Sequence, residues 1–284
     1  MEVGERIMDW FQALVAGIIQ GVTEFLPISS SGHLVMFHTI FGEGSDANLA
    51  FTVFLHLATL LSVVIVFHKD IWTLIHGFFT LIFDIFKGKP DFKSPERRFL
   101  LMVIIGTLPA VAVGALLKLL DLDDVLENIF VVAVMLIVTS AFMFMADKLN
   151  KEKYSEADAP LKNSLMVGLF QAAAILPGLS RSGTTIFAGL LGGFKKEFAV
   201  RYAFILSIPV IVGAGLVEMI DVVKAGSIDI SPVSLSIGFI SAAICGIIAI
   251  NLIKLLIKKK AFYIFGIYCL LASTIAFLAG FGVL

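Results

Sequence analysis

Long apolar segments separated by short charged ones dominate this chain. A helix needs about 20 mainly apolar residues to cross the hydrocarbon core of a bilayer. Six segments have this length and few charges: residues 49–67, 99–120, 126–146, 198–220, 233–257 and 261–284. A further apolar segment, residues 71–86, contains His76 and Asp84 and precedes a charged stretch, which favours a helix in the membrane interface over a span. We therefore predict about six transmembrane helices.

Two other apolar segments, residues 7–41 and 161–194, are interrupted near their centres by proline, serine and glycine. Non-helical backbone at membrane depth is tolerated only where protein or a water-filled cavity satisfies its polar groups. Each segment is therefore predicted to form a re-entrant helical hairpin, which returns to the side of the membrane from which it entered.

These two segments resemble each other in sequence. GIIQ at 17–20 corresponds to GLFQ at 168–171, and PISSSG at 27–32 corresponds to PGLSRSG at 177–183 with one extra residue. Three predicted spans follow each hairpin, and because three is odd the second half must have the opposite topology. The pattern predicts an inverted repeat, about 7–147 and 161–284, in which the two serine-rich hairpin tips meet inside the membrane.

The composition agrees with an all-α polytopic membrane protein. Hydrophobic residues make up 59% of the 284 residues and charged residues 15%, against roughly 45–50% and about 25% in an average soluble domain. The 21 basic and 22 acidic side chains nearly cancel, so the charge gives no indication of a nucleic-acid partner. We expect one membrane domain, 1–284, with a retained N-terminus, because Glu2, Glu5 and Asp9 interrupt any signal-peptide pattern.

Lysine and arginine are distributed unevenly between the two sides of the six predicted spans. One side holds 17 of the 21 basic residues, in segments 69–98, 148–162, 195–201 and 254–260. The positive-inside rule makes this side cytoplasmic. Both termini are then expected outside the cytoplasm, in the plasma (inner) membrane of a bacterium.

Gln20 and Glu24 are the first candidates for chemistry. They are four residues apart, so on a helix they share one face. An ionisable side chain at membrane depth is expensive and by default indicates function. A protonated or interfacial Glu24, and a hydrogen bond between helices for Gln20, are the structural alternatives.

A serine cluster follows Pro27, which cannot lie within a helix without the loss of a backbone hydrogen bond. A new helix is expected to begin within residues 29–31, and a helix N-terminus is a ready site for an anion. His33 lies three residues after Ser30, close enough on a helical turn to act as the base for its hydroxyl. The alternative is that the serines only cap the helix and that His33 is a packed imidazole.

Arg181 lies between two apolar arms, far from the charged loops. A guanidinium there needs an anionic partner, and its planar fork suits a phosphate. An ion pair with Glu24 across the repeat is the structural alternative. The two interpretations are compatible if Arg181 pairs with Glu24 in the empty site and a bound substrate separates them.

The remaining polar residues are expected to have structural roles. His56, inside the span at 49–67, is expected to make a hydrogen bond between helices rather than to line a cavity. Cys245 and Cys269, each within an apolar run, are expected to be small buried hydrophobes.

The two interrupted segments carry a resemblance to a known family. QGVTEFLPISSSGH at 20–33 and PGLSRSGTT at 177–185 resemble the two motifs of the bacterial undecaprenyl-diphosphate phosphatases, also called bacitracin-resistance proteins. The resemblance extends over the whole chain in length, span pattern and repeat. It implies an enzyme that removes the terminal phosphate of a C55 polyprenyl diphosphate in the membrane and so recycles the lipid carrier of cell-wall synthesis.

The resemblance also implies roles for particular residues. Ser30 resembles the proposed nucleophile, His33 its partner, and Arg181 the arginine that holds the phosphates. Gln20 and Glu24 resemble a motif associated with a divalent cation, Mg²⁺ or Ca²⁺, although an amide is a weaker ligand than a carboxylate for such an ion. Further hydrogen bonds to the substrate are expected from Ser29, Ser31, Ser180, Ser182 and Thr185.

Two alternatives remain open from the sequence. Attack by His33 itself or by a metal-bound water could replace attack by Ser30. An inverted-repeat transporter or a polyprenyl-phosphate flippase would bind the same anionic headgroup at the membrane midplane without hydrolysing it.

Overall fold

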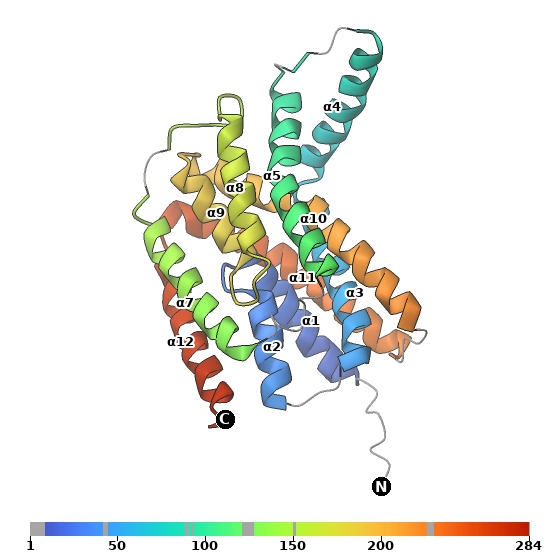
Figure 1. Ribbon diagram of the computed structural model, residues 1–284, viewed down its shortest axis with the longest axis vertical. Coiled ribbons are helices and arrows are strands. Elements are labelled where there is room, and N and C mark those ends of the chain that lie inside the picture. The colour runs from blue at the N-terminus through green and yellow to red at the C-terminus, as the bar shows by residue number, and fades with distance from the viewer. Residues whose placement is uncertain are drawn as a thin grey trace.

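The computed structural model describes residues 9–41, 45–88, 91–92, 94–120, 128–149, 152–225 and 230–283. In this part of the chain the secondary structure is helical, apart from one isolated bridge between Tyr154 and Phe194. The helices of the first half are α1 (Trp10–Phe25), α2 (Ser30–Phe41), α3 (Ser45–Val66), α4 (His68–Phe86), α5 (Pro95–Leu119) and α7 (Ile129–Ala146) (Figure 1). The second half contains α8 (Leu161–Ala173), α9 (Arg181–Leu191), α10 (Lys196–Ala225), α11 (Pro232–Leu256), the short 3₁₀ helix η1 (Ile257–Lys259) and α12 (Tyr263–Gly280).

The prediction of an all-α polytopic membrane protein is confirmed. Within the described residues, five helices are long and apolar enough to cross a membrane: α5, α7, α10, α11 and α12. Helices α3 and α4 together also have the length and apolarity of a span, although they are bent by 86° at the break between them, and they give a sixth span if they are counted as one. The expected span at 49–67 corresponds to α3, and the expected interfacial helix at 71–86 corresponds to α4. The position of α4 in the interface stays a prediction.

The outer surfaces of the long helices are apolar. Large side chains such as Leu216 on α10 and Leu271 on α12 are more than 60% exposed. In water this exposure would be unfavourable, whereas lipid chains cover such side chains without cost. The exposed faces therefore fit a protein surrounded by a bilayer.

Both interrupted segments form pairs of helices. The first pair, α1 and α2, is broken at residues 26–29, and α2 begins at Ser30, inside the range expected for a new helix. Ser29 has a φ of +69°, a left-handed backbone that non-glycine residues rarely adopt, and this conformation helps turn the chain between the two helices. The second pair, α8 and α9, is broken at residues 174–180.

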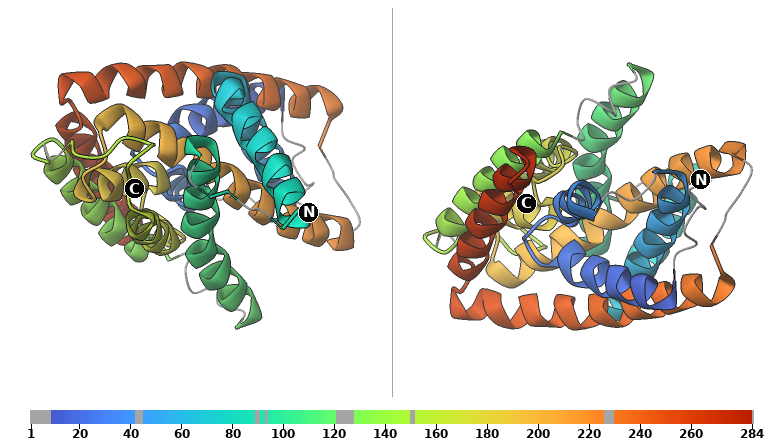
Figure 2. Two further views of the ribbon diagram at one scale, coloured as in Figure 1. Left: turned by 90° about the horizontal axis from the view of Figure 1, so that it is seen from above. Right: turned by 90° about the horizontal axis from the view of Figure 1, so that it is seen from below.

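The first arm of each hairpin packs against a long helix of the other half. Helix α1 lies along α11 (Figure 2), and α8 lies along α5. Glycines allow both close approaches: a Cβ on Gly17 would lie 2.4 Å from the carbonyl oxygen of Gly238, and one on Gly168 would lie 2.5 Å from that of Gly106. This reciprocal exchange is the packing expected of a two-fold repeat. The repeat boundaries at 7–147 and 161–284 stay a prediction.

Helices α7 and α12, the last helix of each half, pack side by side. Two buried serines join them, because Ser140 donates to the carbonyl oxygen of Gly266 at 2.7 Å and Ser273 donates to that of Ala133 at 2.7 Å. Cys269, also on α12, is fully buried, as its apolar context predicts. Cys245 on α11 is only partly buried, because its side of the helix is closer to the surface.

Candidate active site

The tips of the two hairpins touch each other. The hydroxyl of Ser182 donates to the carbonyl oxygen of Leu26 at 3.2 Å, and a Cβ on Gly32 would lie 3.0 Å from the Cα of Gly178. The prediction that the serine-rich tips meet is therefore confirmed. Because α2 and α9 both begin at these tips, two helix N-termini, the positive ends of the helix dipoles, are gathered in one place, where they favour an anion.

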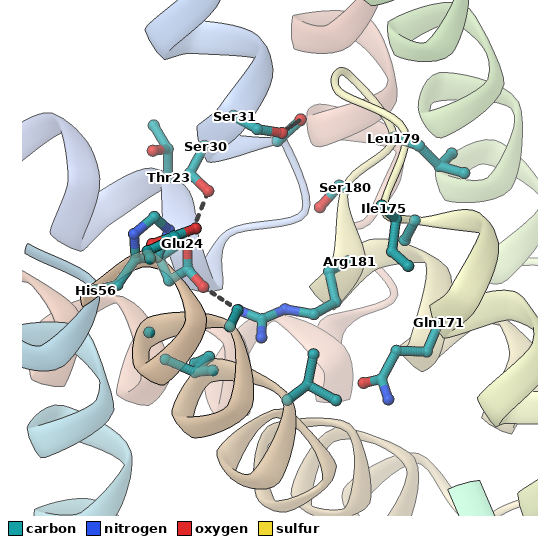
Figure 3. A pocket seen from close by; sticks show the side chains of 17 residues that line it. Thr23, Glu24, Ser30, Ser31, His56, Gln171, Ile175, Leu179, Ser180 and Arg181 are labelled. Carbon is teal, nitrogen blue, oxygen red and sulfur yellow. Dashed lines mark hydrogen bonds and ion pairs between the residues drawn. The ribbon is translucent and has the colours of Figure 1, made fainter. Parts of the chain in front are cut away.

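Glu24 is the centre of the site. It is 6% exposed and accepts hydrogen bonds from three side chains: Ser30 to Oε2 at 2.7 Å, Gln20 to Oε2 at 3.1 Å, and Arg181 to Oε1. Figure 3 shows the bonds from Ser30 and Arg181 converging on this carboxylate. The ion pair between Arg181 and Glu24, which the sequence analysis held as the structural alternative, forms, and it compensates a charge that would otherwise be buried alone.

A cavity of about 250 Å³ lies beside this cluster. Its polar wall comes from both hairpins and α3, and a largely apolar wall comes from the second hairpin and α10. The lining residues used below are Glu24, Ser30, His56, Arg181, Ala214 and Gly215. Glu24, Ser30 and Arg181 therefore share one cavity, as the sequence predicted.

His33 does not join them. Its Nδ1 donates to the carbonyl oxygen of Ser29 at 2.7 Å, and its Nε2 is 2.7 Å from the hydroxyl of Tyr268, with the two rings stacked. The predicted bond between His33 and Ser30 is wrong for this structure, because the imidazole turns back toward residue 29 and the Ser30 hydroxyl points to Glu24. His33 instead holds the turn that precedes α2.

His56 is a site residue that the sequence analysis misplaced. Its Nδ1 donates to the carbonyl oxygen of Thr52 at 3.0 Å, on its own helix, and not to another helix as expected. Its Nε2 faces Glu24, 3.9 Å from Oε2, on the wall of the cavity. The four-residue spacing allows His56 to bond the backbone of Thr52, one helical turn earlier. This spacing does not specify which neighbouring helix the other side of the ring faces.

The other predicted binding residues divide into two groups. Ser29, Ser31 and Ser180 line the cavity, whereas Ser182 and Thr185 do not. Ser180 caps α9 by accepting from the N–H of Gly183 at 3.2 Å, and Thr185 donates to the carbonyl oxygen of Arg181 at 2.8 Å. Thr185 thus helps fix the first turn of the helix that carries Arg181.

Gln20 and Gln171, which occupy equivalent positions in the two hairpins, are both buried. Gln20 donates to Glu24, and Gln171 donates weakly to the carbonyl oxygen of Gly106 at 3.4 Å. The side-chain oxygen of each lacks a hydrogen-bond partner. Gln171 lines the cavity, whereas Gln20 lies behind Glu24, so the two amides contribute differently to the site.

The donor set near Glu24 limits how a divalent cation could bind. Among the described residues, no three His, Cys, Asp or Glu side chains converge as metal ligands. Glu24 offers one carboxylate on the cavity wall, whereas the unpartnered side-chain oxygen of Gln20 is buried behind it. Magnesium at phosphate sites commonly uses one or two carboxylates, with water and substrate oxygens completing the shell. Glu24 therefore fits a cation that would be shared with the phosphates of a bound substrate.

This chain is similar to known proteins over almost its whole length. A family model described as bacitracin resistance protein BacA matches residues 13–275. The undecaprenyl-diphosphatase of Methanosphaera stadtmanae is 39% identical over 95% of this chain and 97% of its own length. The undecaprenyl-diphosphatase of Methanobrevibacter smithii is 42% identical over 95% of this chain and 98% of its own length. That of Halothermothrix orenii is 37% identical over 96% of this chain and 99% of its own length.

Proposed function

Because the chain belongs to the bacitracin resistance protein BacA family, we propose that it is a phosphatase of undecaprenyl diphosphate. It removes the terminal phosphate, releases undecaprenyl phosphate and inorganic phosphate, and so returns the lipid carrier to cell-wall synthesis. The observation that supports this function best is the cluster of Ser30, Glu24 and Arg181 on one cavity wall. A nucleophile, an acceptor for its proton and a cation are together there.

Substrate binding starts from the ion pair between Arg181 and Glu24. A diphosphate that enters the cavity offers the guanidinium a second, doubly hydrogen-bonding anion. The N-termini of α2 and α9 add backbone N–H groups on the same side. Arg181 therefore turns its donors partly toward the phosphates, where it stabilises the charge that develops during phosphoryl transfer.

The hydroxyl of Ser30 then attacks the terminal phosphorus. Its Oγ forms the new P–O bond, its proton passes to Glu24 Oε2 at 2.7 Å, and the bond between the terminal phosphate and the lipid phosphate breaks. Water subsequently attacks the phosphoserine, which frees inorganic phosphate and restores the hydroxyl. A divalent cation held by Glu24 would neutralise part of the diphosphate charge when it is bound.

The proton acceptor proposed from this geometry differs from the one expected from the motif. Glu24, and not His33, accepts the hydrogen bond of Ser30. His33 contributes by position, since it bonds the carbonyl oxygen of Ser29 next to the nucleophile. Attack by a water molecule would use the same carboxylate as its base.

Phosphate release by the purified protein tests this function. With undecaprenyl diphosphate as substrate, the wild type should release one phosphate per lipid. Arg181→Ala should be slower by a factor of about 100 or more, because one strong donor to the developing charge is gone. Arg181→Lys should recover little, since a point charge cannot reproduce a bidentate contact. A folded wild type that binds the lipid but releases no phosphate would favour the flippase or transporter.

The distribution of basic residues supports a location and an orientation. We propose that the protein lies in the plasma (inner) membrane with both termini outside the cytoplasm. The sequence support is the concentration of basic residues in segments that alternate with the outer loops.

A further inference from the structure

Gly215 lies in the middle of α10 and on the wall of the cavity. Glycine is, apart from proline, the least favourable residue in a helix interior, so its presence there needs a reason. The residue is buried, yet a Cβ built on it would meet no atom within 4 Å. Because Gly215 is buried but has open space beside its Cα, a side chain at this position would project into the cavity.

The buried glycines of the hairpin contacts behave differently. A Cβ on Gly17, Gly168 or Gly106 would collide with an opposing helix at 2.1 to 2.5 Å. Those glycines allow helices to approach each other. Close helix packing does not explain Gly215, since no other helix approaches it.

The wall around Gly215 is apolar and reaches the molecular surface. Ile211, Ala214 and Gly215 share one face of α10, the helix that passes below Arg181 in Figure 3. Ile211 is buried, whereas Ala214 lines the cavity and is also exposed. The cavity is therefore open to the outside of the protein past Ala214. Glu218 lies one turn further on the same face and ends the apolar surface.

We propose that the hydrocarbon chain of the substrate leaves the phosphate site over Ala214 and Gly215, and that Gly215 keeps this passage open. The inference rests on the proposed function, which requires a cavity that joins a polar phosphate site to the lipid phase. The first isoprene units would lie against Ile211 and the Cα of Gly215.

A pair of matched substitutions tests the passage. Gly215→Leu places a side chain in the cavity, whereas Gly213→Leu places the same side chain on an exposed part of the same helix, where a Cβ also meets no atom within 4 Å. Neither change creates a clash at Cβ, and both replace a helix-interior glycine with a better helix former. Size-exclusion profiles and melting temperatures should therefore stay close to those of the wild type.

The expected result is a selective loss of lipid binding. Gly215→Leu should raise the KM for undecaprenyl diphosphate about tenfold, the change expected if a few methylene groups lose their packing, and Gly213→Leu should stay within about twofold. Inorganic pyrophosphate, which has no chain, should inhibit both variants and the wild type with similar inhibition constants.

Two results would overturn the inference. An unchanged KM in a folded Gly215→Leu variant would show that the chain does not pass there. An equal weakening of pyrophosphate and lipid binding would show that the leucine disturbs the phosphate site instead. Both outcomes differ from failure of the proposed function, which would be seen as absence of phosphate release by the wild type.

Discussion

Glu24 brings together the chemistry of this site at the scale of single residues. Its two oxygens accept bonds from a hydroxyl, an amide and a guanidinium, while His56 lies 3.9 Å away. A buried carboxylate with a compensating cation is stable, but removal of one partner leaves an uncompensated charge. Substitutions here should therefore affect both catalysis and folding, and each test needs a check that the variant is folded.

The contact between Ser30 and Glu24 predicts that these residues act as a unit. Ser30→Ala should lower kcat by about three orders of magnitude or more, as in other enzymes that lose a nucleophile. Glu24→Gln, which keeps the shape but cannot take the proton, should cause a comparable loss, and the double variant should be little worse than either single one. Phosphate release measured on monodisperse protein tests this.

Ser31 provides the control for that prediction. It also lines the cavity, but its hydroxyl is 3.4 Å from Ser29 and does not contact Glu24. Ser31→Ala should keep activity within about tenfold of the wild type. Full activity of Ser30→Ala would reject the nucleophile and make water the attacking group.

The carboxylate of Glu24 and the neighbouring amide of Gln20 lead to a prediction about divalent cations. A chelator should suppress phosphate release and added Mg²⁺ or Ca²⁺ should restore it, because Glu24 is suited to share a cation with substrate phosphates. Gln20→Glu should lower the cation concentration needed for half-maximal activity, since hard cations prefer charged oxygen ligands. Undiminished wild-type activity in chelator would leave Arg181 and the helix N-termini as the stabilisers of charge.

The helices themselves were predictable from the sequence because length and apolarity determine them. The expected spans at 99–120 and 261–284 correspond to α5 and α12 within a few residues. The contact of Ser30 with Glu24 was not predictable, because the two residues are six positions apart on either side of a broken helix. It depends on the backbone of the turn, where Ser29 has a positive φ. His56 and Gly215 reach the site from other helices, and nothing local in the sequence fixes which way α3 and α10 are rotated.

Close packing between helices gives a prediction at the scale of elements. A side chain on Gly168 would collide with the backbone of Gly106, where α8 meets α5. Gly168→Leu should therefore separate the second hairpin from α5 and destabilise the protein by roughly 1–3 kcal/mol or more, as overpacking does. The apparent melting temperature in detergent should fall by several degrees.

Gly213→Leu is the matched control, since α10 leaves open space there. It should melt at or slightly above the wild-type temperature, because leucine is the better helix former. Equal melting temperatures for Gly168→Leu and Gly213→Leu would contradict the close contact between α8 and α5.

At the scale of the whole molecule, the basic segments gather at one end. Arg201 at the start of α10 pairs with Asp70 at 3.2 Å and with Glu156, and Lys258 pairs with Glu197 at 3.6 Å. These contacts join the segments 69–98, 148–162, 195–201 and 254–260, which hold 17 of the 21 basic residues. The start of α1 and the end of α12 lie at the other end of the molecule (Figure 1). The fold thus has one strongly basic end and one end that carries both termini.

This arrangement predicts which residues are accessible from outside an intact cell. In a chain with Cys245 and Cys269 replaced, single cysteines at Trp10 and Val283, both exposed and near the two ends of the chain, should react with a membrane-impermeant maleimide in intact cells. A cysteine at Lys153, which is exposed among the basic segments, should react only after the membrane is permeabilised. The physical reason is that positively charged loops are retained on the cytoplasmic side during insertion. Labelling of Lys153→Cys alone in intact cells would invert the proposed orientation, and labelling at only one of the two ends would contradict an even number of spans.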